Sequence, residues 1–135
     1  MNDLDVNDSP GYSALVAEHF EQPGNVGMLT GHYEIMLCGA AGQREHGTEV
    51  IFHAGIDNAL IVAMTFQVFG CPHTIAACSI LAERLTGRPV ESLNEVRFNE
   101  LAASLDLPIE KMGRLLIIED ALRKCRVAWD NRRLG

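Results

Sequence analysis

Hydrophobic positions along the first half of the chain change from a helical to a strand-like period. Apolar residues recur at helical spacing from Tyr12 to Phe20, and Pro23-Gly24 ends the helix that this spacing predicts. The pattern that follows predicts three strands, over His32–Cys38, Thr48–His53 and Ala59–Phe69. We therefore expect one helix followed by a sheet.

In the third predicted strand, large apolar residues recur at every second position. The residues expected to share one face are Leu60, Val62, Met64, Phe66 and Val68. Gly55-Ile56-Asp57-Asn58 precedes this strand and predicts a hairpin turn. Because short turns join neighbouring strands in opposite directions, we expect an antiparallel sheet.

Helical spacing returns after Gly70. The pattern predicts helices over Pro72–Leu85, Val90–Leu101 and Ile109–Trp129, with Gly87 and Pro89 closing the first and a break at Leu105–Pro108. One stripe of the last helix is apolar and consists of Leu115, Ile118, Leu122, Cys125 and Trp129. The order helix, strands, helices predicts an α+β two-layer domain with a three-stranded antiparallel sheet packed on helices.

Length and composition bound the number of domains. The chain has 135 residues, of which 47% are hydrophobic, and its formal net charge is −7. This length and apolar content fit one domain with a sizeable core. We expect a flexible acidic leader over residues 1–11 and a single domain over residues 12–135.

Charge and hydropathy exclude several classes of protein. An acidic balance offers no counterion-release affinity for phosphate backbones, so nucleic-acid binding is not expected. The longest apolar run, Ala59–Met64, is too short to span a bilayer. Met1–Ser9 is acidic and holds no Lys or Arg, which is the reverse of a signal or transit peptide. We expect a cytoplasmic protein without a membrane partner, and its four cysteines are too sparse for a disulfide framework.

Cys71 is the most informative residue for chemistry. It stands between an apolar strand and a helix that opens with Pro72. A thiol there faces unpaired backbone N–H groups and the positive end of the helix dipole, and both favour the thiolate. Thiolate is the species that binds metal or attacks sulfur. The alternative interpretation is a small buried hydrophobic residue, because free cysteine often packs in cores.

Other candidates for chemistry are more ambiguous. Glu45 and His46 lie in a polar loop before the second predicted strand and could hold zinc or iron together with a thiolate, or could simply be exposed. Cys38 ends the first predicted strand and could face either the core or that loop. His73 is expected to face solvent in the first helical turn. The two cysteines expected to pack in the core are Cys78 and Cys125.

Four segments of the chain together resemble a known family. Residues Tyr12–Gly27 hold Tyr-Ser, then His-Phe-Glu-Gln-Pro, then Asn-Val-Gly, and Phe69–Ser79 holds an aromatic-Gly-Cys segment that runs into a small-residue helix. Leu107-Pro108-Ile109-Glu110-Lys111 is similar to a Leu-Pro-Pro-Val-Lys segment, and Glu119-Asp120-Ala121 follows it. In this order and spacing, the segments resemble the IscU/NifU N-terminal family of iron–sulfur cluster assembly scaffolds over about Tyr12–Trp129.

The resemblance implies a fold, a role and a site. It implies an IscU/SufE-like two-layer domain that assembles iron–sulfur clusters and is not a turnover enzyme. Cys71 matches a family cysteine, whereas the family's Cys-Gly-Asp falls on Glu45-His46-Gly47 and its His-Cys on Gly113-Arg114. We therefore expect a divergent scaffold that binds iron, zinc or a labile cluster at Cys71, with His46, Glu45 or Cys38 as further ligands.

Two alternatives follow from the same resemblance. In one, the chain is a SufE-like sulfur acceptor: Cys71 takes a persulfide from a cysteine desulfurase, and Arg114 stabilises the thiolate. In the other, the chain is a non-catalytic paralogue that binds partners. A dedicated chaperone is the partner that the resemblance implies for Leu107, Pro108 and Lys111.

Overall fold

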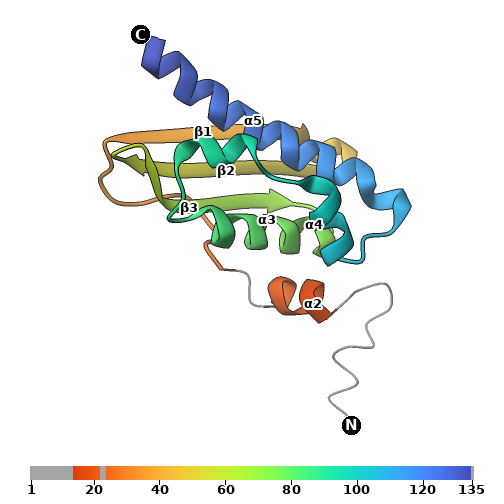
Figure 1. Cartoon of the computed structure of the whole chain (residues 1–135). Helices are drawn as coiled ribbons and strands as arrows, with labels where there is room; N and C mark the ends of the chain where they lie inside the picture. The colour runs from red at the N-terminus through yellow and green to blue at the C-terminus, as the bar shows by residue number, and fades with distance from the viewer. Residues whose placement is uncertain (1–13, 22–23, 135) are drawn as a thin grey trace.

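The sheet has three antiparallel strands in the order β1-β2-β3, as the sequence predicts (Figure 1). A computed structural model describes residues 14–21 and 24–134, so the expected acidic leader lies outside the described residues. The strands are β1 (Ile35–Gln43), β2 (Thr48–Asp57) and β3 (Leu60–Phe69), and a 3-10 turn, η1 (Arg44–His46), joins the first two.

The helices gather on one side of the sheet. They are α2 (Ala14–Glu21), α3 (Pro72–Leu85), α4 (Phe98–Ser104) and α5 (Met112–Leu134), with the 3-10 turns η2 (Val90–Asn94) and η3 (Ile109–Lys111) between them. The long helix α5 crosses β1 and β2, α3 packs along β3, and α2 packs on α3 (Figure 1). None of the described helices combines the length and hydrophobicity that a membrane crossing requires.

The last helix packs as predicted. Its expected apolar stripe, Leu115, Ile118, Leu122, Cys125 and Trp129, is buried. The approach of α5 to β1 is close because Gly39 has no side chain. A Cβ built on Gly39 would lie 2.2 Å from the carbonyl oxygen of Ala121. The alternation of a strand therefore turns Cys38 and Ala40 to the opposite, helix-free face of the sheet.

Strand β1 corrects the predicted strand His32–Cys38, because it begins at Ile35 and continues to Gln43. The added residues, Gly39–Gln43, are small or polar and have weak intrinsic strand preference. They are extended because each pairs with a residue of β2. Pairing with a neighbouring strand and packing under α5 override the local preference here.

The hairpin turn lies later than predicted. Strand β2 continues to Asp57, and the turn is formed by Asn58 and Ala59, whose φ values are 53° and 62°. Two residues with positive φ form the type of turn whose twist matches that of paired strands. Glu34 anchors it, since its backbone N–H donates to Asp57 Oδ1 at 2.8 Å and its Oε1 accepts from the Asn58 N–H at 2.9 Å.

The predicted alternation of β3 fails at its first two positions. Leu60 and Val62 are each 41% exposed, whereas Ile61 is fully buried. The pairing with β2 shifts at Gly55/Ile56 and leaves Val62 without a direct partner, which is a β-bulge. One extra residue reverses the side that each earlier side chain faces, so Ile61 joins Met64 in the core.

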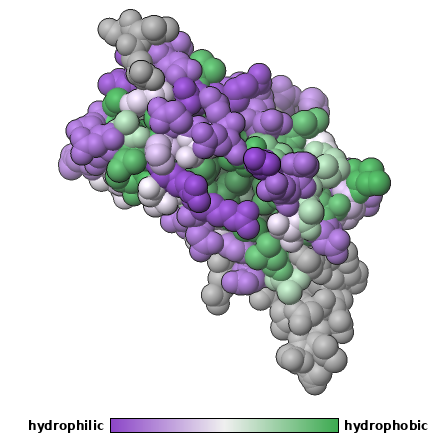
Figure 2. Space-filling view, in the orientation of Figure 1, coloured by the Kyte–Doolittle hydropathy of each residue, from purple (hydrophilic) through white to green (hydrophobic). Residues whose placement is uncertain are grey.

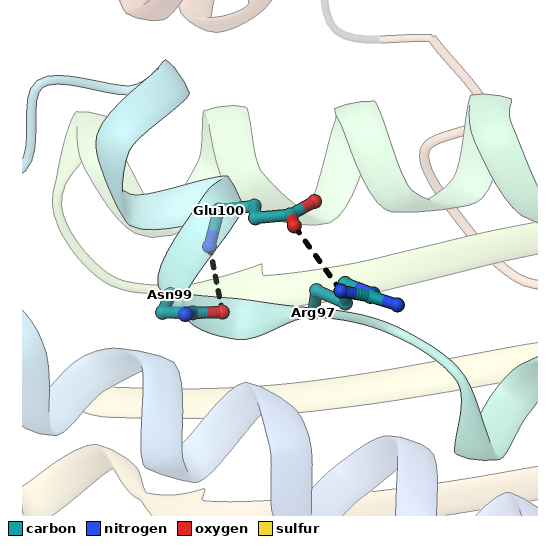
Figure 3. A network of polar contacts seen from close by, with 3 residues as sticks. All are labelled: Arg97, Asn99 and Glu100. Atoms are coloured by element: carbon teal, nitrogen blue, oxygen red, sulfur yellow. Dashed lines mark hydrogen bonds and ion pairs between the residues drawn. The ribbon is translucent and has the colours of Figure 1, made fainter.

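The helix predicted over Val90–Leu101 is two elements, η2 and α4, separated by residues 95–97. Tertiary hydrogen bonds hold the start of this region against the hairpin, because the Val90 N–H donates to Ala59 O at 3.0 Å. Figure 3 shows the first turn of α4, where Arg97 Nη1 lies 3.5 Å from Glu100 Oε2 and the Glu100 N–H donates to Asn99 Oδ1 at 2.9 Å. The helix predicted over Pro72–Leu85 has those bounds in the structure, and Gly87 follows it with a φ of +93°.

The close approach at Gly39 predicts a large loss of stability in Gly39→Val. The added side chain would overlap backbone atoms of α5, so we expect the free energy of unfolding to fall by about 3 kcal/mol. Ala40→Val is the matched control, since it lies on the helix-free face and should change stability by no more than about 0.5 kcal/mol. Urea unfolding followed by circular dichroism measures both. Equal effects of the two substitutions would contradict this account of α5 packing.

Candidate functional site

Cys71 lies where β3 gives way to α3, as the sequence predicts. It is the N-cap residue of α3, with an extended backbone (φ −84°, ψ 169°), and Pro72 follows as the first helical residue. The thiol is half-buried. Since Phe69 pairs with Glu49 and Gln43 pairs with Thr48, Cys71 and η1 flank the same end of the sheet. We call this end the tip.

The surroundings of Cys71 lower the pKa of its thiol. Partial burial by itself raises the pKa. The hydroxyl of Thr74, 3.4 Å from the sulfur, lowers it, and with several weaker effects it outweighs the effect of burial. Those are the backbone N–H groups of Thr74 and His73, which reach the sulfur without regular hydrogen-bond geometry, and the charge of Lys111. The site therefore favours a thiolate, the nucleophilic and metal-binding form.

The cation that acts on Cys71 is not the predicted one. The charge that lowers the thiol pKa belongs to Lys111, in η3, and Arg114 is not among the causes. Arg114 lies in the first turn of α5, where its Nε is buried and has no hydrogen-bond partner among the described residues. The Arg114 side chain is half-buried.

Glu45 and His46 lie at the tip but are both exposed. Their neighbour Arg44 holds η1 against the end of the sheet. Its Nε lies 3.2 Å from Glu49 Oε1, and its guanidinium lies over the Phe69 ring, 5.1 Å from the ring centre. These contacts place η1 beside the strand end that leads into Cys71.

Cys38 does not reach the tip. It pairs with His53 in the middle of β1, on the helix-free face, and is exposed. Five residues of extended strand separate it from Gln43, a distance of about 16 Å. The strand is longer than predicted, and for that reason Cys38 is not at its end.

The four predicted ligands, Cys71, His46, Glu45 and Cys38, are therefore not assembled into one site. Within residues 14–21 and 24–134, no three His, Cys, Asp or Glu side chains lie close enough together to hold a metal ion. Cys78 and Cys125 are fully buried, as predicted. Burial raises the pKa of both thiols, that of Cys125 to about 12 with a further contribution from Cys38, so both stay protonated.

The surroundings of the site correct one further expectation, that of a solvent-facing His73. His73 is only 1% exposed and does not face solvent, because the first turn of α3 is packed inside the two-layer fold. The predicted partner-binding residues Leu107, Pro108 and Lys111 are half-buried, and Leu107 packs against the core. Between them, Ile109 is 88% exposed, so this segment offers an apolar side chain to a partner.

Sequence reasoning missed two residues that act on Cys71, Thr74 and Lys111. Thr74 had a detectable signal, since a polar side chain three residues after an N-cap is placed to interact with it. Lys111 is 40 positions away along the chain, and no local pattern connects it to Cys71.

Lys111→Gln should raise the pKa of the Cys71 thiol, because it removes a nearby positive charge. The pH dependence of Cys71 alkylation by iodoacetamide measures this, in a Cys38→Ser background that leaves Cys71 as the accessible thiol. Arg114→Gln is the matched control and should leave the profile in place. If Arg114→Gln shifted the pH profile of alkylation more than Lys111→Gln, Arg114 and not Lys111 would be the cation that lowers the pKa of Cys71.

Comparison with known proteins gives consistent results. The family model for the NifU-like N-terminal domain matches residues 11–134. The chain is 31% identical over 123 residues to the iron–sulfur cluster assembly scaffold protein IscU of Rickettsia prowazekii, which covers 90% of this chain and 94% of that protein. It is 26% identical over 123 residues to the Escherichia coli protein of the same name, which covers 90% and 96%.

Solved structures share the fold. One is a putative iron–sulfur cluster assembly scaffold protein for the SUF system from Fervidobacterium islandicum, with a TM-score of 0.62 and 15% identity over 83% of this chain and 93% of that one. Another is the N-terminal part of a NifU-like protein from Brucella abortus, with a TM-score of 0.53 and 14% identity over 82% and 77%. This chain is thus a member of the NifU-like N-terminal domain family, whose IscU members are its relatives over most of their length.

Proposed function

We propose that this chain works in iron–sulfur cluster assembly and that Cys71 is its working residue. Relatives that match nearly full length are named iron–sulfur cluster assembly scaffold proteins. The observation that carries the proposal is the state of the Cys71 thiol, which is accessible at the tip and has a lowered pKa.

The step that fits this thiol best is acceptance of sulfur from a cysteine desulfurase. The Cys71 thiolate attacks the outer sulfur of a persulfide on the donor's cysteine. A new sulfur–sulfur bond forms at Cys71, the old one breaks, and the donor cysteine leaves as a thiolate. The electron pair of that bond leaves with the donor, so no external oxidant or reductant is needed.

The donor set at the tip supports sulfur acceptance over cluster binding by one chain. A [2Fe–2S] cluster is held by four ligands that are usually thiolates. Cys78 and Cys125 are buried in the core and Cys38 lies in the middle of β1, so Cys71 is the one described thiol at the tip. One thiolate beside Lys111 suits one anionic sulfur species, which supports the proposal of a carrier or scaffold.

Iron binding is a second candidate function, and the position of η1 favours it. Glu45 and His46 share the tip with Cys71, on a short turn held by Arg44. Imidazole and carboxylate side chains can join a thiolate around iron, or around zinc, if η1 moves toward Cys71. In this arrangement iron is cargo, delivered for assembly.

Partner binding involves two surfaces. The cysteine desulfurase has to reach Cys71 at the tip. A chaperone of the kind that serves the family would engage the segment Leu107–Lys111, where Ile109 is an exposed apolar side chain.

Incubation with a cysteine desulfurase and cysteine should add one sulfur atom to the chain, detected by mass spectrometry of the intact protein. Cys71→Ser should abolish the addition, because Cys71 is the one described thiol at the tip and its pKa is lowered. Cys38→Ser is the matched control, since it removes the exposed thiol outside the tip and should leave the addition unchanged. Sulfur that persists on Cys71→Ser would exclude Cys71 as the acceptor.

Anaerobic titration with ferrous iron tests the second candidate. Bound iron should disappear in Cys71→Ser, and affinity should fall by about tenfold or more in His46→Ala if the imidazole is a ligand. His53→Ala, on the helix-free face, is the control. A wild-type chain that takes up no iron, or an affinity that Cys71→Ser leaves unchanged, would count against this function.

A further inference from the structure

Gly70, Cys71 and Thr74 form a compact group at the start of α3. Thr74 is the third residue of the helix and is only 1% exposed. Its Oγ1 lies 3.4 Å from the Cys71 sulfur. A threonine in a helix can also direct its hydroxyl to the backbone one turn earlier, whereas here the hydroxyl meets the thiol.

The contact between Thr74 and Cys71 depends on the charge of the sulfur. When the thiol is neutral, either group can donate the proton of the hydrogen bond. When the sulfur is a thiolate, only the Thr74 hydroxyl can donate, and hydrogen bonds to charged groups are the stronger ones. Because Thr74 is buried, water competes little for its hydroxyl.

Gly70 provides the space that this contact needs. A Cβ built on Gly70 would lie 3.2 Å from Thr74 Cβ and 3.4 Å from Thr74 Oγ1 and Cγ2. The distance to Thr74 Cβ is tighter than ordinary van der Waals contact, so a side chain at position 70 would press on Thr74. The same displacement would move its hydroxyl relative to Cys71.

From this geometry we infer that Thr74 is a positioning residue for Cys71, and that Gly70 keeps Thr74 in place. The Thr74 hydroxyl holds the sulfur at the tip and stabilises its anionic form. Gly70 acts on the sulfur only through Thr74. The inference deepens the proposed function, because it rests on Cys71 being the working thiol.

The test measures the pH profile of Cys71 alkylation in the Cys38→Ser background. Thr74→Val keeps the shape of the side chain and removes the hydroxyl. The pH at which alkylation of Cys71 reaches half its maximal rate, the midpoint, should therefore rise by about one pH unit. Thr74→Ser keeps the hydroxyl and should show the wild-type pH profile. Thr86→Val is the matched control at the other end of α3, where the hydroxyl bonds to Ala82 O, and should leave the midpoint unchanged.

Gly70→Ala separates positioning from a merely structural effect. It should raise the midpoint in the same direction as Thr74→Val. The double variant Gly70→Ala/Thr74→Val should show no further rise, because both substitutions act through one hydroxyl. If Thr74→Val fails to fold, Gly70→Ala and Thr74→Ser still test the inference, with circular dichroism as the check on folding.

Two outcomes would overturn the inference. One is a folded Thr74→Val with the wild-type midpoint, and the other is additive shifts in the double variant. Sulfur loading by a desulfurase is scored separately on the same variants. A shifted midpoint without any sulfur loading on the wild type would contradict the proposed function while leaving the positioning role supported.

Discussion

The reversal of the chain between β3 and α3 is the constraint on which the site depends. Strand β3 must stop at the end of the sheet and α3 must return along it, since the helices cover a single face (Figure 1). The reversal takes place over Gly70 and Cys71, and Pro72 then begins the helix. Cys71 is therefore held at the tip, beside the first backbone N–H groups of α3, where His73 and Thr74 are buried. The junction of strand and helix thus contributes to the lowered pKa of its thiol, together with the Thr74 hydroxyl and the charge of Lys111.

The tip combines one soft ligand with positive charge. Lys111 supplies a cation near the thiol, and Glu45 lies exposed in η1 at the same end of the sheet. A cation and a hydrogen-bond donor stabilise a single anionic sulfur, whereas a cluster demands several thiolates around it. On the face of the molecule seen in Figure 2, hydrophobic side chains lie among hydrophilic ones.

Where sequence prediction failed, a contact distant in sequence decided the outcome. The bounds of α3 are predictable because a proline, a helical period and a closing glycine are all local signals. Strand β1 is longer than predicted because Gly39–Gln43 are extended by pairing with β2 and packing under α5. The bulge at Val62 reverses the side faced by Leu60 and Ile61, and no periodicity in the sequence reveals one inserted residue. Among site residues, Cys71 was predictable from its position before a helix, but the location of Cys38 depended on where β1 ends.

The sequence by itself determined the order of elements, the antiparallel sheet, the buried stripe of α5 and the acidic potential of Cys71. Each of these follows from residues close together in the chain, through periodicity, turn residues or a helix terminus. Only the tertiary structure decided which groups act on that thiol. Lys111 comes near it because η3 is folded back to the tip, and Thr74 can reach it because Gly70 leaves the space. Charge and packing act through distance in space, and the distance between Cys71 and Lys111 is set by the whole fold.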